Sequence, residues 1–590
     1  MIMNNIRKFV SLVVASVPFV VSAQDIDPTV VVNRAYEGKL MEVHKPLLEM
    51  AIPDTVTRFD LDFDYSVFEK PYKGAYEFNP YVLTMQPASA VQSPKKFFLK
   101  AGLGYTLNPE FDMVWSPVFK GDFRMDVYAF HRSYVGSYRS FRPEADASSS
   151  PVVIDRWKQA GGDKARWKGY DLLTRAGVDG VYDWKTGAIG FDVAYHGLAS
   201  KDLRKTRAYD ALDVSLAVSS KSSQESYFMY DIKADYRFAE DKIVFIEKDD
   251  YVGEHIFDVN AVLGQVFTHE HKMLFDVDLD LAAYNHSVFA GTAGQFSIVP
   301  HYVFARGRWH VDAGLRIAKI LRSNDPDAMF QTREQVVYPD VKAWFAAIPD
   351  ALRVYAVAGG GNRLNTYSSL LQENHHMDTA FGWGRWKFMD ADIERVSVYL
   401  GIDGRIGSKF SYDVHTGYAN YSNALLDAVL VSTVKTMEGP QYVPGVGYAP
   451  YQKYFAAASW SWKTESFRFD GDVEYAYVWG IRNADGLFAP SPLTGKVAFE
   501  YNWSRRVYAG VDCMFATGRK GSILDLTSGD AVHEALIPGY ADLGLYLEVS
   551  ASHMLSFWAR GGNLLNMTIQ RNPLYAERGA YFTLGICLNL

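Results

Sequence analysis

The sequence predicts an all-β protein: a transmembrane antiparallel β-barrel of about 22 strands, with short periplasmic turns and long extracellular loops. Three observations support this fold class. The chain begins with a leader for export, and its predicted strands alternate between apolar and polar residues over long stretches. After the leader, no apolar run approaches the roughly 20 residues that a membrane helix needs. These features leave a secreted β-rich protein or an outer-membrane barrel.

The first 23 residues have the features of a secretory signal peptide. In MIMNNIRKFVSLVVASVPFVVSAQD, Arg7 and Lys8 precede an apolar run over 9–20, and the small residues that end at Ala23 form a cleavage signature. We therefore expect cleavage near Ala23, export from the cytoplasm and a mature protein in the cell outer membrane.

Composition excludes several classes of protein. Removal of Arg7 and Lys8 with the leader leaves 58 basic against 68 acidic residues, and this net charge of −10 argues against nucleic-acid binding. The chain has 2 cysteines, too few for a disulfide scaffold. Aromatic residues make up 15% of the chain, which suits a barrel with aromatic girdles.

The stretch MLFDVDLDLAAY, residues 273–284, shows how the strands are identified. Asp276, Asp278 and Asp280 have the spacing of calcium ligands, but an EF-hand loop needs Gly and Glu where this chain has Leu281 and Ser287. Large apolar residues separate the aspartates, so the stretch is predicted to be a strand with one polar face. The same alternation runs through YFMYDIKADYRF and SFRFDGDVEYAY. Soluble strands average roughly 5–6 residues, whereas barrel strands need roughly 9–11.

The connections between these runs alternate between short and long, as expected when periplasmic turns are short and outer loops are long. About 22 candidate strands fit between Lys96 and Leu590, with boundaries good to a few residues. The tight turns are predicted at 184–187, 306–307, 348–351, 406–408, 464–465 and 504–505, and the long loops near 134–169, 239–253, 359–392, 422–452 and 519–539.

Residues 24–94 differ from the predicted barrel, which occupies 95–590. They contain prolines that interrupt helices and interior strands, at Pro28, Pro46, Pro53, Pro71, Pro80, Pro87 and Pro94. We expect this segment to be extended or irregular and to lie on the periplasmic side or inside the lumen.

The C-terminal residues contain an Asn-Leu-hydrophobic-Asn stretch followed by a predicted final strand. The stretch is Asn563, Leu564, Leu565 and Asn566, and Gly579, Tyr581 and Phe582 lie at the start of the strand. This arrangement resembles the end of TonB-dependent outer-membrane receptors, which close with such a turn and strand. Residues 393–423 are similar to a strand–turn–strand unit of the same barrels. The resemblance implies a 22-strand barrel that binds and transports a ligand.

The chain departs from that family in two respects. Its last residue, Leu590, is not aromatic, and the roughly 70 residues after Ala23 are too few for the globular plug domain of the family. A stretch from Thr29 through Val30 and Val31 to Val32 is similar to the box that contacts TonB, although a simple β-prone stretch would look the same.

The sequence contains no recognisable catalytic motif. GxSxG, HExxH and CxxC are not found in a suitable context, so we expect no enzyme activity and no cofactor. Glu373, His375, His376 and Asp378 lie in one predicted outer loop. Adjacent histidines can bind metal, but we interpret this group as a polar loop tip and predict no metal site.

Charged residues on the polar faces of the strands are the functional candidates. Facing lipid near the midplane would cost roughly 2–4 kcal/mol for each Arg or Lys, so these side chains are expected to line the lumen. The candidates are Asp276, Asp278, Asp280, Asp470, Asp472, Glu474, Arg237, Arg316, Arg405 and Arg468, together with Arg124 and Lys233. Such charges wet a pore, pair across strands or hold the N-terminal segment, and they do not name a substrate.

Two functions fit these features. The first is ligand binding and transport across the outer membrane, with an unknown ligand and the TonB complex as the energy source. The second is a plugless structural or scaffold barrel that docks partner proteins, such as an outer-membrane lipoprotein, through residues 24–94 and 422–452. In the second loop, the apolar run 424–434 is expected to form a loop helix or an interface. Outer-membrane lipid surrounds the barrel in both cases.

Overall fold

The computed structural model describes most of the chain from Lys96 onward. The described residues are 96–105, 107–139, 152–154, 166–202, 205–222, 225–245, 249–285, 291–322, 334–377, 389–433, 440–482 and 485–590. The predicted signal peptide, the proline-rich segment 24–94 and the TonB-box-like stretch lie outside them.

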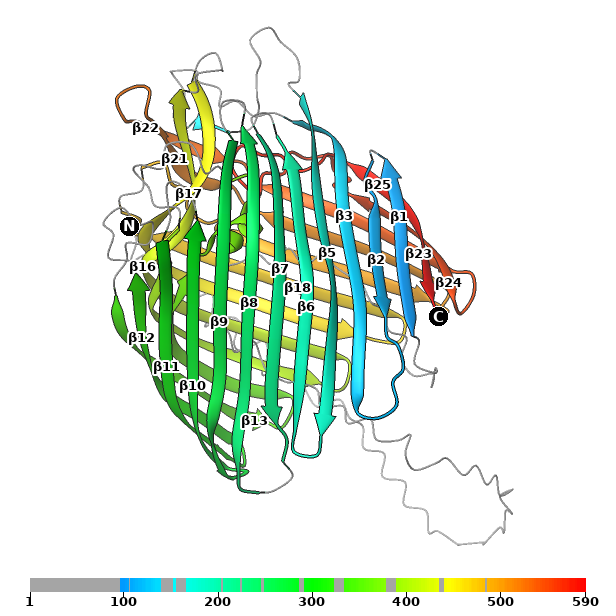
Figure 1. Cartoon of the computed structure of the whole chain (residues 1–590), viewed down its shortest axis with the longest axis vertical. Helices are drawn as coiled ribbons and strands as arrows, with labels where there is room; N and C mark the ends of the chain where they lie inside the picture. The colour runs from blue at the N-terminus through cyan, green and yellow to red at the C-terminus, as the bar shows by residue number, and fades with distance from the viewer. Residues whose placement is uncertain are drawn as a thin grey trace, which may run out of the picture. The chain divides into compact units, whose positions relative to one another are not determined.

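The described residues form a closed antiparallel barrel (Figure 1). Its strands are β1 (Phe97–Tyr105), β2 (Glu110–Trp115), β3 (Phe123–Arg139), β5 (Arg166–Trp184), β6 (Gly187–Lys201), β7 (Lys205–Ser220), β8 (Tyr227–Phe245), β9 (Asp249–Thr268), β10 (His271–Asn285), β11 (Gly291–Arg306), β12 (Trp309–Arg322), β13 (Gln335–Ile348), β14 (Leu352–Leu364), β15 (Ala391–Ile406), β16 (Phe410–Thr433), β17 (Pro440–Lys463), β18 (Phe467–Trp479), β19 (Leu493–Trp503), β20 (Val507–Ala516), β23 (Tyr540–Ser550), β24 (Leu555–Gly562) and β25 (Tyr581–Asn589). The predicted 22-strand barrel is confirmed.

Among the described residues, three further strands and one helix lie beyond the circuit. They are β4 (Val152–Val153), β21 (Arg519–Asp525), β22 (Ala531–Ile537) and α3 (Tyr367–Glu373). The hairpin of β21 and β22 pairs in parallel with the end of β16, where Leu430 lies opposite Leu524, and with β4, where Val152 lies opposite Ala535. Among the described residues, no helix has the length and apolar character needed to span a bilayer.

The barrel closes between its first and last strands. β1 and β25 run antiparallel over eight paired positions, from Phe98 opposite Asn589 to Tyr105 opposite Phe582. This pairing leaves neither strand with a free edge, which is the condition for crossing a bilayer with β-structure. Side chains on one face of each strand are large, apolar and exposed, for example Leu216 and Leu400, as expected of a surface that contacts lipid.

The short connections confirm the predicted turns. β5 and β6 are joined by two residues, and the predicted turns between β11 and β12, β13 and β14, β15 and β16, β17 and β18, and β19 and β20 are also found. The backbone of Gly307 has φ of 61°, and Ser504 and Arg505 have φ of 53° and 58°. The three residues between the paired Trp503 and Val507 form this turn, and Ser504 and Arg505 adopt the left-handed backbone conformation within it.

The predicted long loop 422–452 is wrong, because β16 and β17 extend through it and leave only six residues between them. The run 424–434, which was expected to form a loop helix or an interface, is strand as far as Thr433. Alanine and leucine side chains such as Leu426 pack against Leu487 on one face, while Val429 and Val431 pack against Ile523 on the other. A strand covered on both faces carries a continuous apolar run, which imitates the pattern of a buried helix.

Two other predicted loops are also shorter than expected. β8 and β9 occupy most of 239–253, and β14 continues through the glycines of 359–361 to Leu364. The strands are longer than a bilayer requires: β8 has 19 residues and β9 has 20, against the roughly 9–11 that cross it. The additional residues extend these strands beyond the membrane. The polar and small residues there do not distinguish a strand from a loop in the sequence.

The residues that resemble the family's C-terminal motif form a fixed turn. Asn563 and Asn566 have positive φ, at 45° and 51°. The buried Asn563 side chain donates to the carbonyl oxygens of Met567 (2.9 Å) and Arg578 (3.2 Å) and accepts from the backbone N–H of Met567 (2.9 Å). Asparagine tolerates this backbone conformation and satisfies the turn, so the motif has a structural role between β24 and β25.

Candidate functional site at the outer mouth

The segment between β14 and β15 folds against the inner wall of the barrel. Tyr367, Leu370 and Leu371 of α3 belong to one buried apolar cluster with Tyr209 and Ala211 of β7. These two residues lie on the opposite face of β7 from Leu212 and Leu216, which are exposed on the outside. The helix therefore covers the lumenal side of β7 and its neighbours, at the end of the barrel where the long loops gather.

Buried charges hold this segment in place. The side chains of Arg207 and Asp241 are 0% exposed, and Arg207 Nε lies 2.9 Å from Asp241 Oδ2. The hydroxyl of Tyr367 donates to the same carboxylate. At the start of α3, the backbone N–H of Ser368 lies 3.2 Å from both oxygens of buried Glu254, and its hydroxyl also donates to Glu254. A carboxylate that accepts the free N–H groups of a helix N-terminus is stabilised there.

Two cations of β7 bind the backbone that follows α3. Lys205 Nζ donates to the carbonyl oxygens of His376 (2.7 Å) and Met377 (3.0 Å). Arg207 donates to the carbonyl oxygens of His375 (2.5 Å) and Met377 (2.8 Å). These contacts satisfy consecutive carbonyl groups and fix the backbone of 375–377, so both histidine side chains start from defined positions.

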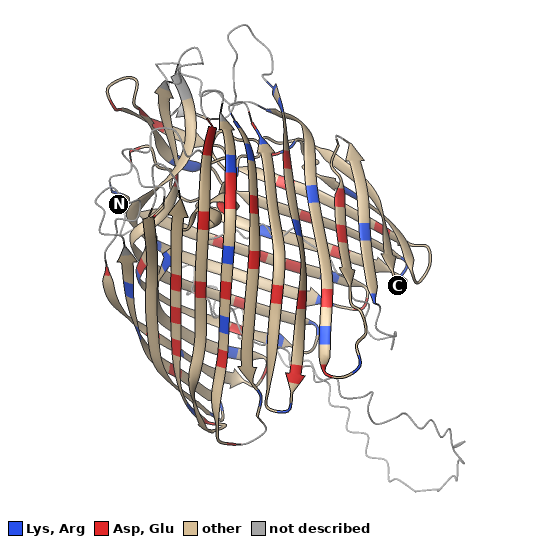
Figure 2. Ribbon diagram, viewed as in Figure 1, with Lys and Arg blue, Asp and Glu red and all other residues tan. Residues whose placement is uncertain are grey.

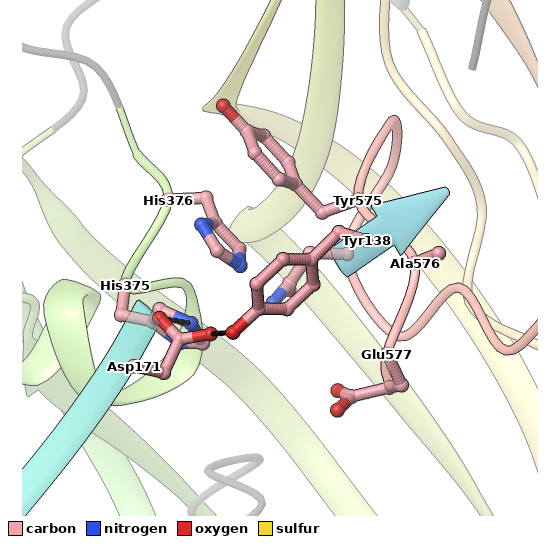
Figure 3. A pocket seen from close by; sticks show the side chains of 8 residues that line it. Tyr138, Asp171, His375, His376, Tyr575, Ala576 and Glu577 are labelled. Carbon is pink, nitrogen blue, oxygen red and sulfur yellow. Dashed lines mark hydrogen bonds and ion pairs between the residues drawn. The ribbon is translucent and has the colours of Figure 1, made fainter. Parts of the chain in front are cut away.

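The two histidines line a small cavity (Figure 3). It has about 20 Å³ of free volume, and its other lining residues are Tyr138, Asp171, Asn572, Tyr575, Ala576 and Glu577. His375 Nε2 lies 3.3 Å from Asp171 Oδ1, and the Tyr138 hydroxyl donates to the other oxygen of Asp171 at 2.5 Å. The His376 ring is stacked on the Tyr575 ring, with centroids 3.8 Å apart. This volume admits one water molecule or ion and excludes larger ligands.

The electrostatic surroundings of the two histidines differ. Burial and the neighbouring His375 lower the pKa of the His376 imidazole well below its usual value, so His376 is neutral. Burial also disfavours the protonated form of His375, but the adjacent Asp171 carboxylate outweighs it and raises the pKa of His375. The pair therefore presents one neutral imidazole, His376, and one imidazole, His375, whose protonated form is stabilised by the Asp171 carboxylate.

Further down the wall, the predicted aspartates of β10 take part in cross-strand contacts. Asp278 accepts from Ser297 (2.8 Å) and pairs with Arg316 (3.2 Å), which also reaches Asp340 (3.4 Å). His301 Nε2 lies 3.2 Å from Asp276, and Gln295 donates to Asp280. Figure 2 shows that charged positions recur along β5 to β10 over much of their length. The side chains of this wall are partly exposed, so they can contact a polar ligand.

The other candidate residues are distributed around the barrel. Arg237 pairs with Asp213, Arg468 with Asp470, Glu474 with Lys453, Lys233 with Asp235 and Arg124 with Asp183, while Asp472 and Arg405 are exposed. The β10 aspartates pair with His301 of β11 and Arg316 of β12, whereas the acidic residues of β18 pair with Arg468 and Lys453, so the two acidic groups have separate partners. Asp378 lies outside the described residues, and Glu373 pairs with Arg363 at 2.6 Å.

The sequence did not reveal the residues that surround the histidines. Asp171 lies on β5 and Tyr138 on β3, while Tyr575 lies in the loop before β25. These segments are far apart in sequence, and none carries a local motif. Arg207 and Asp241 occupy inward positions of their strands, and the alternation of apolar and polar residues along the sequence indicates these positions. Their complete burial depends on α3, which the sequence placed in an open loop.

Comparisons with known proteins identify the fold. No known protein family and no curated protein matches the sequence. Solved structures do match. The FrpB iron transporter from Neisseria meningitidis aligns at 10% identity with a TM-score of 0.60, over 85% of this chain and 82% of that chain. The copper transporter OprC aligns at 11% identity with a TM-score of 0.56, over 84% of this chain and 80% of that chain.

A third similar structure is the siderophore receptor PirA from Acinetobacter baumannii, at 10% identity and a TM-score of 0.56, with 84% of this chain and 80% of that chain covered. At these identities the similarity is one of fold. The three proteins are transporters and receptors of the TonB-dependent type. The resemblance inferred from the C-terminal motif is thereby confirmed, and the chain has the barrel fold of TonB-dependent outer-membrane receptors.

Proposed function

We propose that this protein is an outer-membrane transporter that captures a ligand at its outer mouth and passes it through the lumen. The observation that carries the proposal is the inward-folded α3 segment, which builds a structured polar mouth on a wide barrel. A scaffold would have no need to line its lumen in this way. The similar structures are an iron transporter, a copper transporter and a siderophore receptor, so metal ions and metal complexes are the first ligands to test.

The charged wall below the mouth would form the ligand route. Asp278 and Arg316 are paired but retain exposed side-chain area, at 29% and 19%. Asp472 of β18 is exposed as well. Side chains of this kind keep a pore hydrated and offer weak, repeated contacts, which suit passage better than tight retention. The predicted lumen-lining residues would act as a set, with no single one essential.

Energy would come from an inner-membrane TonB complex that pulls on the box-like stretch 29–32 after cleavage near Ala23. Residues 24–94 would obstruct the lumen in place of a standard plug domain. A 22-strand barrel without an obstruction would be a wide leak. Outer-membrane transporters with 22 strands accordingly have a plugged lumen.

Single-channel conductance in a planar bilayer tests this proposal. The full-length mature protein should stay closed, and deletion of 24–94 should open a large conductance. A matched control replaces 29–32 with alanine: the segment keeps its length, so the pore should stay closed while ligand-dependent uptake by cells is lost. If the deleted form also stays closed, the loops fill the lumen, and a scaffold that docks a lipoprotein becomes the better explanation. Stoichiometric co-purification of a partner would then support it.

A further inference from the structure

We propose that Asp171, His375 and His376 form a binding site for a divalent transition-metal ion of the Zn²⁺ class at the outer mouth. One ligand atom from each of the three side chains lies within 4.8 Å of the other two. Two imidazoles and a carboxylate are a donor set that Zn²⁺ accepts in proteins. The site joins two segments, β5 and the loop after α3, and does not depend on whether the barrel transports anything.

The distance between the first two ligands fits a shared metal ion. Tetrahedral coordination with bonds of about 2.0–2.1 Å places ligand atoms roughly 3.3 Å apart, and Asp171 Oδ1 lies 3.3 Å from His375 Nε2. Both atoms are buried, and neither takes part in a hydrogen bond of acceptable geometry. Buried polar atoms rarely remain without a hydrogen bond. A cation between them would satisfy both at once.

The surrounding residues hold the ligands in position. The Tyr138 hydroxyl donates to Oδ2 of Asp171, which leaves Oδ1 directed toward His375. Partners of this kind orient metal-binding carboxylates in proteins. The backbone of both histidines is bound by Lys205 and Arg207. The His376 ring is stacked on Tyr575, and the imidazole would rotate out of this stacked position to reach the ion.

The cavity selects the size of the ligand. Its free volume of about 20 Å³ accommodates one ion. Glu577 also lines the cavity, and its carboxylate favours a cation there. The alternative is a plain ion pair between Asp171 and protonated His375 with no metal, and the experiment below separates the two.

Isothermal titration of Zn²⁺ into the purified, chelator-treated full-length protein in detergent tests the proposal. We expect one ion per chain, and we expect H375A, H376A and D171N each to weaken binding by more than about tenfold, since loss of even an outer-shell partner costs about 10–100-fold. Tyr138→Phe should weaken it less. The control is His533→Ala, which removes an exposed histidine of the outer hairpin and should leave the affinity unchanged.

A second measurement reports the coordination directly. Co²⁺ in place of Zn²⁺ should give the intense visible absorption of a tetrahedral site, and H376A should abolish it. Heat-modifiable migration on gels would verify that every variant retains the barrel. If Zn²⁺ does not bind with one-to-one stoichiometry, or if H533A weakens binding as much as H375A, the site is refuted and the ion-pair interpretation holds.

Discussion

Two arginine–aspartate pairs join the same two strands, β7 and β8, in different surroundings. Near the outer end, the side chains of Arg207 and Asp241 are both 0% exposed. Closer to the middle of the strands, the side chains of Arg237 and Asp213 are both 24% exposed, and Arg237 makes two hydrogen bonds of 2.5 Å and 2.9 Å to its partner. The residue types are identical, and the covering α3 segment makes the difference.

The comparison distinguishes a charge pair that holds a segment in place, Arg207 and Asp241, from a charge pair that lines the lumen, Arg237 and Asp213. A fully buried pair loses its hydration and gains little net stability, but removal of one partner is costly because the other charge stays buried. Arg207 also binds two backbone carbonyl groups of the loop after α3. It therefore positions the loop, whereas Arg237 remains partly exposed in the lumen.

The largest effect should follow from Arg207→Met. The change leaves the Asp241 carboxylate buried without its partner and removes the hydrogen bonds to the backbone of 375–377. The free energy of opening of the segment 365–377 should therefore fall by about 3–5 kcal/mol. Hydrogen–deuterium exchange of peptides from this segment measures the loss. Faster exchange confined to 365–377 is expected, and unchanged exchange there would show that Arg207 does not hold the loop.

Leu370→Ala should have the next largest effect. Leu370 is 0% exposed in the cluster between α3 and the wall. A cavity at this position should cost about 2–3 kcal/mol, the low end for a buried leucine because a short loop helix can relax. The same exchange measurement reports it, with Gln372→Ala, an exposed change in the same helix, as the control. If both variants behave alike, the packing of α3 does not decide the burial of the Arg207 pair.

Arg237→Met should have the smallest effect, about 1 kcal/mol or less, because Asp213 keeps access to water when its partner is lost. The denaturant midpoint of the barrel measures it, alongside Arg207→Met under the same conditions. A loss as large as that of Arg207→Met would remove the distinction between the two pairs.

The sequence predicted the barrel well and its mouth poorly. Alternation identified β10 as a strand when its aspartates imitated a metal loop, and the turns beside Gly307 and Ser504 lie where turn chemistry placed them. It failed at β16, where burial of both faces of the strand removes the alternation. It also failed at α3, because a helix of seven residues held by distant charges has little local signal.

By itself, the sequence determined that this chain is a large β-barrel. The two-residue period of a strand and the thickness of a bilayer act on each segment separately, so they leave a pattern that can be read locally. Only the tertiary structure decided that α3 folds inward, that Arg207 is buried and Arg237 is not, and that Asp171 meets His375 and His376. Those outcomes depend on contacts between distant segments, and the same residue types would be unremarkable anywhere else on the wall.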